Sequence, residues 1–177
     1  LFRLILDLIE PNSGNVTIDG EPVARRDEWK SLVGSFLDEG FLIDYLTPDE
    51  YFKFVGKLYH KSEGDIAQFL EGMKDFFNDE ILGGKKLIRD LSKGNQKKVG
   101  IAALISDPKI LILDEPFTAL DPSSQIRLKR LLNELQQKDH MTMLISSHDL
   151  NHVTEVCSRT VVLEKGKIVR DIQTSED

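Results

Sequence analysis

The chain has 177 residues, a formal net charge of −7 and 40% hydrophobic residues, which is typical of one globular domain with a hydrophobic core. The acidic balance argues against a nucleic-acid-binding protein, because such proteins usually carry a basic face. The single cysteine, Cys157, excludes an internal disulfide framework and a multi-cysteine zinc site, and no apolar run reaches the roughly 18 residues that span a bilayer.

The first 40 residues predict one helix and two strands. Residues 1–9 (LFRLILDLI) are apolar at nearly every position, which predicts a helix buried in the core. Residues 15–20 alternate apolar and polar side chains before an Asp-Gly pair, the pattern of a short strand that enters a tight turn. Residues 31–40 (SLVGSFLDEG) predict a second strand that ends in acidic residues and glycine.

Residues 46–90 show no strand pattern, and we expect them to form an α-helical subdomain. Its first helix has a clear start, because Thr47 is a cap, Pro48 takes the first helical position and Glu50 completes a Thr-x-x-Glu capping box. The helical pattern continues to about residue 78. We expect this subdomain to be inserted into an α/β core made of residues 1–45 and 91–177.

The rest of the chain alternates helical and strand patterns. We expect helices over about residues 95–106, 122–138 and 149–157, strands over 109–116 and 141–147, and a closing hairpin over 160–169. The first of these strands is a continuous apolar run, as in a strand buried on both faces, and the second is also expected to be buried. The alternation of such strands with helices predicts a parallel sheet. The hairpin is expected to turn at Lys165-Gly166.

Asp114 and Glu115 directly follow the apolar part of the strand over residues 109–116. In α/β sheets, ligands bind beyond the carboxyl ends of the parallel strands. One of two adjacent carboxylates can hold Mg²⁺ while the other orients or deprotonates an attacking water. The alternative is a solvated strand end followed by a helix cap.

His148 follows the next strand at the equivalent edge of the sheet. A histidine there can hydrogen-bond a phosphate oxygen or a positioned water, although a purely structural histidine is the alternative. The other histidines, His60, His140 and His152, have no comparable setting, and we expect them on the surface.

The segment SKGN predicts a helix start that can bind an anion. Ser92, Lys93, Gly94 and Asn95 bring a hydroxyl, a cation and a small residue to the free backbone N–H groups of a helix N-terminus. The alternative is an ordinary capped helix with a lysine-rich solvent face.

Together these segments resemble the nucleotide-binding domain of ATP-binding-cassette (ABC) transporters. LSKGN (91–95) resembles the signature Leu-Ser-Gly-Gly-Gln, with lysine in place of one glycine and asparagine in place of glutamine. ILILDEP (110–116) resembles the Walker B strand, ALD (119–121) the D-loop and SSHD (146–149) the switch-histidine region. The four segments stand in the family's order and at its spacings, and the resemblance covers essentially the whole chain. It implies a P-loop NTPase-like parallel sheet with an inserted helical subdomain.

The resemblance also implies roles for site residues, with ATP and Mg²⁺ as cofactors. It implies that Asp114 supports Mg²⁺, that Glu115 is the general base or orients the water, and that His148 contacts the γ-phosphate. These roles fit phosphoryl transfer, in which positioning and charge neutralisation supply most of the catalysis.

The remaining implied roles concern a second nucleotide-binding domain. The signature residues grip the γ-phosphate of a nucleotide held by the opposite subunit, and here they are Ser92, Lys93, Gly94 and Asn95. Asp121 resembles the D-loop residue that reaches across this dimer interface.

One position departs from the family pattern. Counting from Gly34, the usual glutamine of the Q-loop is Asp38 here. We expect Asp38 to act as a second ligand of Mg²⁺, because a carboxylate meets the ion better electrostatically than an amide does. The Asp38 carboxylate also adds negative charge near Glu115. We hypothesise that the positive charge of Lys93 partly balances it. In having an acidic residue near this position, the chain resembles exporter-like members of the family.

The main hypothesis is an ATP-hydrolysing subunit of a bacterial ABC exporter. Such a subunit is cytoplasmic, lies on the inner face of the membrane through a permease, forms a head-to-tail homodimer or heterodimer, and has no nucleic-acid partner. The alternatives are a non-transporter ABC-type ATPase and a catalytically altered regulatory subunit. The sequence contains no long coiled-coil insertion or tandem cassette, and it keeps the catalytic residues Asp114, Glu115 and His148.

The opening segment adds a further expectation. In ABC ATPases, a run like residues 1–14 directly follows the Walker A loop, whose Gly-Lys-Ser/Thr wraps the phosphates. We therefore expect a chain cut just after Walker A that lacks the N-terminal strands. The intact protein is expected to hydrolyse ATP, and residues 1–177 alone are expected to be inactive.

Overall fold

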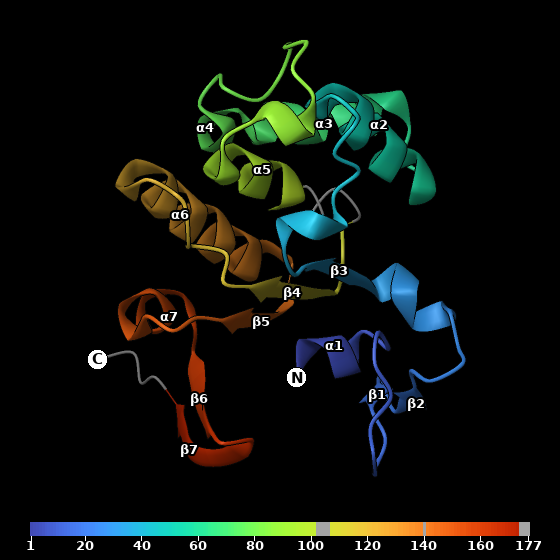
Figure 1. Ribbon diagram of the computed structural model, residues 1–177, viewed down its shortest axis with the longest axis vertical. Helices are drawn as coiled ribbons and strands as arrows, with labels where there is room; N and C mark the ends of the chain where they lie inside the picture. The colour runs from blue at the N-terminus through green and yellow to red at the C-terminus, as the bar shows by residue number, and fades with distance from the viewer. Residues whose placement is uncertain (102–106, 140, 174–177) are drawn as a thin grey trace.

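A three-stranded parallel sheet forms the centre of the computed structural model, which describes residues 1–101, 107–139 and 141–173 (Figure 1). The strands are β3 (Val33–Phe36), β4 (Ile110–Asp114) and β5 (Thr142–Ser146), in the order β3-β4-β5. Residues 110–113 of the central strand β4 pair with both neighbours, and Asp114 pairs with β5. The predicted parallel sheet and α/β class are therefore confirmed.

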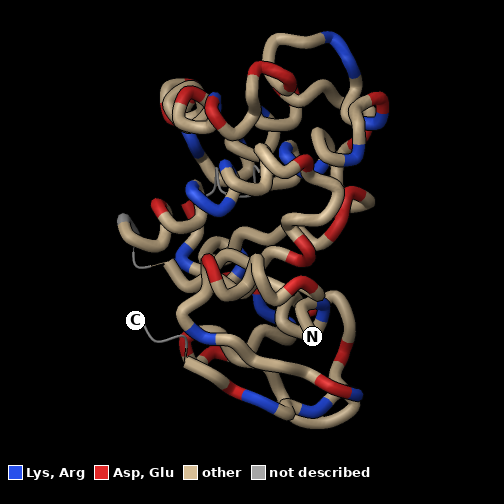
Figure 2. The backbone as a smooth tube through the Cα atoms, turned by 90° about the vertical axis from the view of Figure 1, so that its left-hand side faces the viewer, with Lys and Arg blue, Asp and Glu red and all other residues tan. Residues whose placement is uncertain are grey.

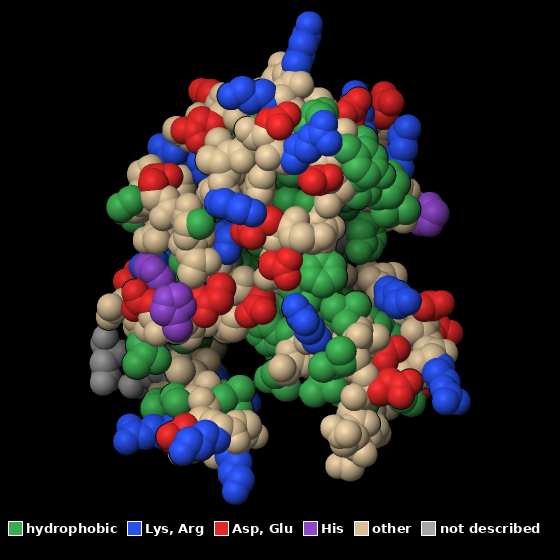
Figure 3. All heavy atoms as spheres, viewed as in Figure 1, with side chains coloured by type: hydrophobic (Ala, Val, Ile, Leu, Met, Phe, Trp, Pro, Cys, Tyr) green, Lys and Arg blue, Asp and Glu red, His purple; other side chains and the backbone are tan. Residues whose placement is uncertain are grey.

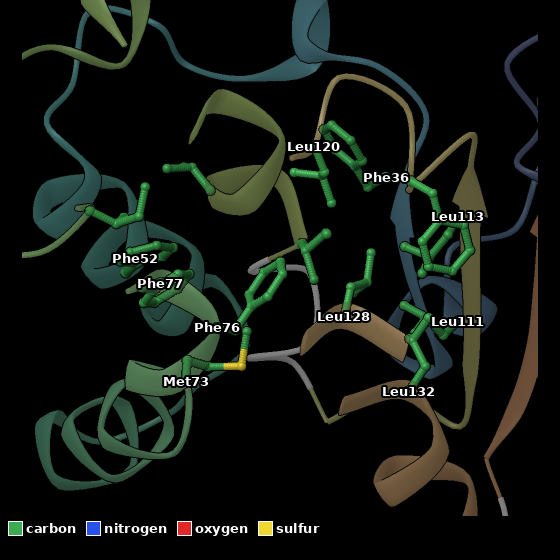
Figure 4. Packing of buried hydrophobic residues seen from close by; sticks show 14 of the residues in the cluster. Phe36, Phe52, Met73, Phe76, Phe77, Leu111, Leu113, Leu120, Leu128 and Leu132 are labelled. Carbon is green, nitrogen blue, oxygen red and sulfur yellow. The ribbon is translucent and has the colours of Figure 1, made fainter. Parts of the chain in front are cut away.

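The two faces of β4 pack against different hydrophobic clusters. Leu111 and Leu113 point to one face, where they meet Leu128 and Leu132 of helix α6 (Pro122–Asp139) (Figure 4). Ile112 points to the other face, where its cluster includes residues of the N-terminal segment. This alternation follows from the two-residue period of a strand and explains why the strand reads as a continuous apolar run.

Helices gather above the sheet in Figure 1 over residues 48–100. They are α2 (Pro48–Leu58), α3 (Glu63–Gly72), α4 (Lys74–Phe77), the 3-10 turn η3 (Ile88–Asp90) and α5 (Lys93–Gly100). The predicted capping box is confirmed, because the side chain of Thr47 accepts from the Glu50 backbone and Glu50 accepts from the Thr47 backbone. Phe52 of α2 stacks on Phe77 of α4 with ring centroids 5.4 Å apart (Figure 4).

The helix predicted over residues 95–106 is α5, which begins two residues earlier, at Lys93. It is described to Gly100, and residues 102–106 lie outside the described part of the chain.

The N-terminal segment differs from the prediction of a buried nine-residue helix. Helix α1 spans only Phe2–Ile5 and contains no buried residue, and Leu1 is 70% exposed. The left-handed φ of 54° at Asp7 is incompatible with continuing the helix. Phe2, Ile5 and Leu6 are only partly buried where they pack on the core. The apolar composition of this segment therefore does not correspond to burial.

The predicted strand and turn after α1 are confirmed as a small hairpin. Strands β1 (Thr17–Ile18) and β2 (Glu21–Pro22) pair antiparallel through Asp19 and Gly20, which both have positive φ. The 3-10 helices η1 (Glu28–Leu32) and η2 (Glu39–Phe41) flank β3.

The C-terminal part contains α7 (Leu150–Val156) and a hairpin of β6 (Arg159–Glu164) and β7 (Lys167–Gln173). The hairpin turns at Lys165-Gly166, as predicted, and both residues have positive φ. Among the described residues, no helix combines the length and apolar character that crossing a membrane requires.

Candidate nucleotide site

The carboxyl ends of β4 and β5 bring Asp114 and Ser146 side by side. The two residues are register partners in the parallel ladder, and the Ser146 hydroxyl donates a hydrogen bond to the Asp114 carboxylate. The same hydroxyl accepts from the backbone N–H of Glu115 at 3.0 Å. Ser146 therefore connects both acidic residues to the neighbouring strand.

Glu115 and His148 form a pair at this edge. The Glu115 carboxylate lies 2.9 Å from Nδ1 of His148, which donates to it when that nitrogen carries the proton. Glu115 has a left-handed φ of 47°, an unfavourable conformation for a residue with a side chain, which the surrounding contacts must hold. Figure 3 shows histidine and acidic side chains adjoining one another on the viewed face. The predicted site residues Asp114, Glu115 and His148 thus lie together.

The start of α5 has the predicted capped geometry. The Ser92 hydroxyl accepts from the Asn95 backbone N–H at 3.2 Å, and both Ser92 and Lys93 are exposed. The buried amide of Gln96 donates to three backbone carbonyls of the preceding turn, which fixes where the helix begins. Exposed N–H groups at a helix start are suited to binding an anion.

Gly94 packs against the D-loop segment. A Cβ atom at Gly94 would lie 2.8 Å from the carbonyl oxygen of Ala119, so only glycine permits this approach. The signature-like turn and residues 119–121 are therefore neighbours within one chain.

Asp121 caps α6. Its carboxylate accepts from the backbone N–H groups of Ser123 and Ser124, both at 3.0 Å, and from their hydroxyls. These hydrogen bonds, first the one from the Ser124 hydroxyl and then that from Ser123, hold the pKa of Asp121 well below its usual range. In this structure the Asp121 side chain is engaged within its own helix start.

Asp38 lies in the loop that follows β3. Its carboxylate accepts from the backbone N–H of Gly40 at 2.8 Å and caps the turn η2. The site at the ends of β4 and β5, made of Asp114, Glu115, Ser146 and His148, is called the strand-end site below. The neighbouring Glu39 contacts a lysine beside this site, since its carboxylate pairs with the ammonium of Lys97 at 3.7 Å.

The oxygen ligands at Asp114 fit a Mg²⁺ ion. Mg²⁺ in nucleotide sites is held by one or two carboxylates together with phosphate oxygens and water, and Asp114 and Ser146 supply a carboxylate and a hydroxyl. Within the part of the chain that the structure describes, no group of three His, Cys, Asp or Glu side chains could hold a metal. An ion bound here would therefore need phosphate and water ligands.

Sequence reasoning missed Ser146, Lys97 and Thr118. Lys97 donates to the Glu115 carbonyl and to the Thr118 hydroxyl, both at 2.8 Å. Ser146 could have been found from its place at the end of the strand next to β4, once the register with Asp114 was considered. The sequence carries no local signal for the lysine contacts, which join residues 18 or more positions apart.

The expectation for the other histidines was wrong for His152. Its side chain is only 17% exposed, and its ring lies 4.7 Å from that of Phe117, because α7 packs against the loop that follows β4. His60 is exposed as expected, and His140 lies outside the described residues.

A family model described as "ABC transporter" matches residues 1–118. The chain is 33% identical to the ABC transporter ATP-binding protein NatA of Bacillus subtilis, over 96% of this chain and 69% of NatA. It is 31% identical to the methionine import ATP-binding protein MetN of Carboxydothermus hydrogenoformans, over 97% of this chain and 52% of MetN. The chain spans 48–61% of the length of three further relatives.

Solved structures show the same fold. An ATP-binding subunit of an ABC transporter superposes with a TM-score of 0.85 at 26% identity, over 97% of this chain and 72% of that one. A dimeric ATP-binding cassette bound to ADP and Pi gives a TM-score of 0.83 at 23% identity, over 99% of this chain and 79% of that one. The family match over two thirds of the chain, the curated relatives and the strand-end site agree: the chain belongs to the ABC transporter family.

Proposed function

We propose that this chain is part of an ATP-hydrolysing subunit of an ABC transporter. The observation that carries the proposal is the contact of Glu115 with His148 beside the Asp114–Ser146 pair. Glu115 orients or deprotonates the attacking water, and His148 contacts the γ-phosphate while it holds the Glu115 carboxylate in place. Asp114 supports Mg²⁺, which neutralises charge on the phosphates when it is bound.

We propose that Asp38 is a second ligand of the Mg²⁺ ion, beside Asp114. Its carboxylate is engaged with the Gly40 backbone, so this role requires the turn η2 to release it. The acidic residue at this position also favours an exporter.

The exposed start of α5 supports a head-to-tail dimer. Ser92 and Lys93 are exposed, and Gly94 and Asn95 are half-buried beside them. We assign these four residues to the γ-phosphate of a nucleotide on the opposite subunit. We also assign Asp121 to this dimer interface, a role that requires exchange of its hydrogen bonds with the serine hydroxyls. Its closeness in sequence to Ala119, which contacts Gly94, supports the assignment.

We assign residues 46–90 to a helical subdomain, and residues 1–45 and 91–177 to the core. The partner in this proposal is a membrane permease that holds the subunit at the cytoplasmic face. Lys and Arg are interspersed with Asp and Glu along the backbone (Figure 2), which differs from the basic face of a nucleic-acid-binding protein.

The test is steady-state ATP hydrolysis by the complete natural protein. Glu115→Gln is expected to lower kcat at least about a hundredfold, because the amide cannot accept a proton from water. Glu134→Gln changes an exposed glutamate on α6 and is the matched control. An unchanged rate for Glu115→Gln would remove Glu115 from the mechanism.

A further inference from the structure

A buried lysine joins three segments beneath the strand-end site. The side chain of Lys97, on α5, is 6% exposed. Its ammonium donates to the Glu115 carbonyl and the Thr118 hydroxyl, both at 2.8 Å, and pairs with Glu39 at 3.7 Å. It also lies 5.9 Å from the centroid of the Phe36 ring. One cation thus contacts β3, the loop after β3 and the segment after β4.

Because Lys97 is charged and buried, the position of its ammonium depends on the groups that compensate the charge. A buried ammonium must be compensated by an anion and by hydrogen-bond acceptors, because it has three donors and no acceptor of its own. The anion here is Glu39, directly after Asp38 in the turn η2. The position of the cation therefore depends on where this loop lies.

The other contacts of Lys97 bear on the conformation of Glu115. The left-handed backbone of this residue is held at its N–H by Ser146 and at its carbonyl by Lys97 and Thr118. These contacts fix the two peptide planes on either side of the Glu115 Cα atom. The orientation of these planes sets the direction in which the side chain leaves the backbone toward His148.

We propose that Lys97 is a positioning residue for Glu115, and that its pairing with Glu39 makes this positioning depend on the turn η2. Movement of the turn, such as release of Asp38, then alters the geometry of Glu115 without direct contact between them. The inference rests on the proposed function for the role of Glu115 in hydrolysis.

The neighbouring lysine offers a matched control. The side chain of Lys98 is 2% exposed and pairs with Glu80 at 3.2 Å, in the loop after α4. Lys97→Met and Lys98→Met therefore each remove a buried, paired ammonium from the same helix. In the complete natural protein, Lys97→Met is expected to lower kcat by roughly ten- to a hundredfold with KM for ATP changed less than about threefold, because misplacement of a catalytic group costs rate more than binding. Lys98→Met is expected to leave kcat unchanged.

A second readout does not require hydrolysis. In Lys97→Met, amide hydrogen exchange is expected to become faster in residues 37–42 and in residues 115–119. In Glu39→Gln it is expected to become faster in residues 37–42, and in Lys98→Met it is expected to change in neither segment. Glu39→Gln is also expected to lower kcat, by a smaller factor than Lys97→Met, and it decides the question if Lys97→Met does not fold.

The proposal is overturned if the two lysine variants lose kcat equally. It is also overturned if Lys97→Met or Glu39→Gln leaves both kcat and amide hydrogen exchange unchanged. If the wild-type protein hydrolyses no ATP, the proposed function fails, and the exchange of the two segments alone decides the role of Lys97.

Discussion

Gly94 at the start of α5 lies against the backbone of Ala119, so closely that a Cβ atom would stand 2.8 Å from the carbonyl oxygen. The contact partner is backbone and cannot rotate away as a side chain would. This packing joins the signature-like turn to the D-loop segment, and it gives a direct test of the fold around the site.

Gly94→Ala is therefore expected to destabilise the protein by about 1–3 kcal/mol through overpacking. Gly72→Ala is the control, because a Cβ atom at Gly72, in α3, meets no atom within 4 Å, and alanine is the better helix former. Urea unfolding followed by circular dichroism compares the two. A Gly94→Ala variant as stable as Gly72→Ala would contradict the close approach.

Gly100 and Phe36 form a second tight contact, between α5 and β3. A Cβ atom at Gly100 would lie 2.0 Å from the Phe36 ring, so Gly100→Ala is expected to cost about 1–3 kcal/mol. Phe36→Leu makes room, so the double variant is expected to lose less stability than the sum of the two single changes. Additive losses in denaturant unfolding would show that the two residues do not contact each other.

The lowered pKa of Asp121 predicts that the stability of the protein depends on pH. Its pKa is held below the ordinary 3.8 by hydrogen bonds from Ser124 and Ser123, so its contribution is present above that value and is lost as pH falls through the lower pKa of the folded protein. Asp121→Ala is expected to lower Tm at neutral pH, with the difference from wild type shrinking below about pH 4.

Asp121→Asn provides the control for this experiment, since it keeps the capping oxygen but does not titrate. Its Tm difference from wild type is expected to fall with pH in the same range, while its difference from Asp121→Ala stays constant. A Tm difference between Asp121→Ala and wild type that is independent of pH would argue against the hydrogen-bonded carboxylate.

Ser146 is expected to affect hydrolysis through Asp114 and Glu115. Ser146→Ala removes the hydroxyl that donates to one and accepts from the other, and a roughly tenfold or greater loss of kcat is expected in the complete natural protein. Ser31→Ala, which removes an exposed hydroxyl bonded to the Glu28 carbonyl, is the matched control. Equal rates in the two variants would show that Ser146 does not act on the site.

The 177 residues contain no Gly-x-x-x-x-Gly-Lys-Ser/Thr sequence. A polypeptide of these residues is therefore expected to bind Mg-ATP weakly and to hydrolyse none of it, because that loop supplies most phosphate contacts in P-loop enzymes. Isothermal titration with Mg-ATP measures the affinity. A dissociation constant in the low micromolar range or tighter would contradict this expectation.

Much of the fold could be predicted because its signals are local. The capping box at Thr47, the turn at Lys165-Gly166 and the apolar run of β4 each depend on neighbouring residues, and each appears in the structure as expected. The predicted buried helix over residues 1–9 was wrong, because the helix ends at Ile5 and Leu1, Leu8 and Ile9 are exposed.

The candidate site was predictable only in part, for the same reason. Asp114 ends β4 and His148 follows β5, so their shared edge follows from the parallel pairing of these strands. The contacts of Lys97 with Glu115 and of Ser146 with Asp114 join residues 18 and 32 positions apart, and they depend on register and packing. A lysine in a helix ordinarily indicates a solvent-exposed face, so the sequence alone did not predict that Lys97 is buried.

Strand β4 is restrained on four sides, by hydrogen bonds to β3 and β5 along its edges and by apolar side chains above and below. A strand held in this way does not shift by small amounts, because any displacement breaks both ladders and both packed layers at once. Asp114 at its end is therefore the stationary reference of the site. If the proposed function holds, conformational changes at the site are expected in the surrounding parts, such as the turn η2, rather than in the position of this carboxylate.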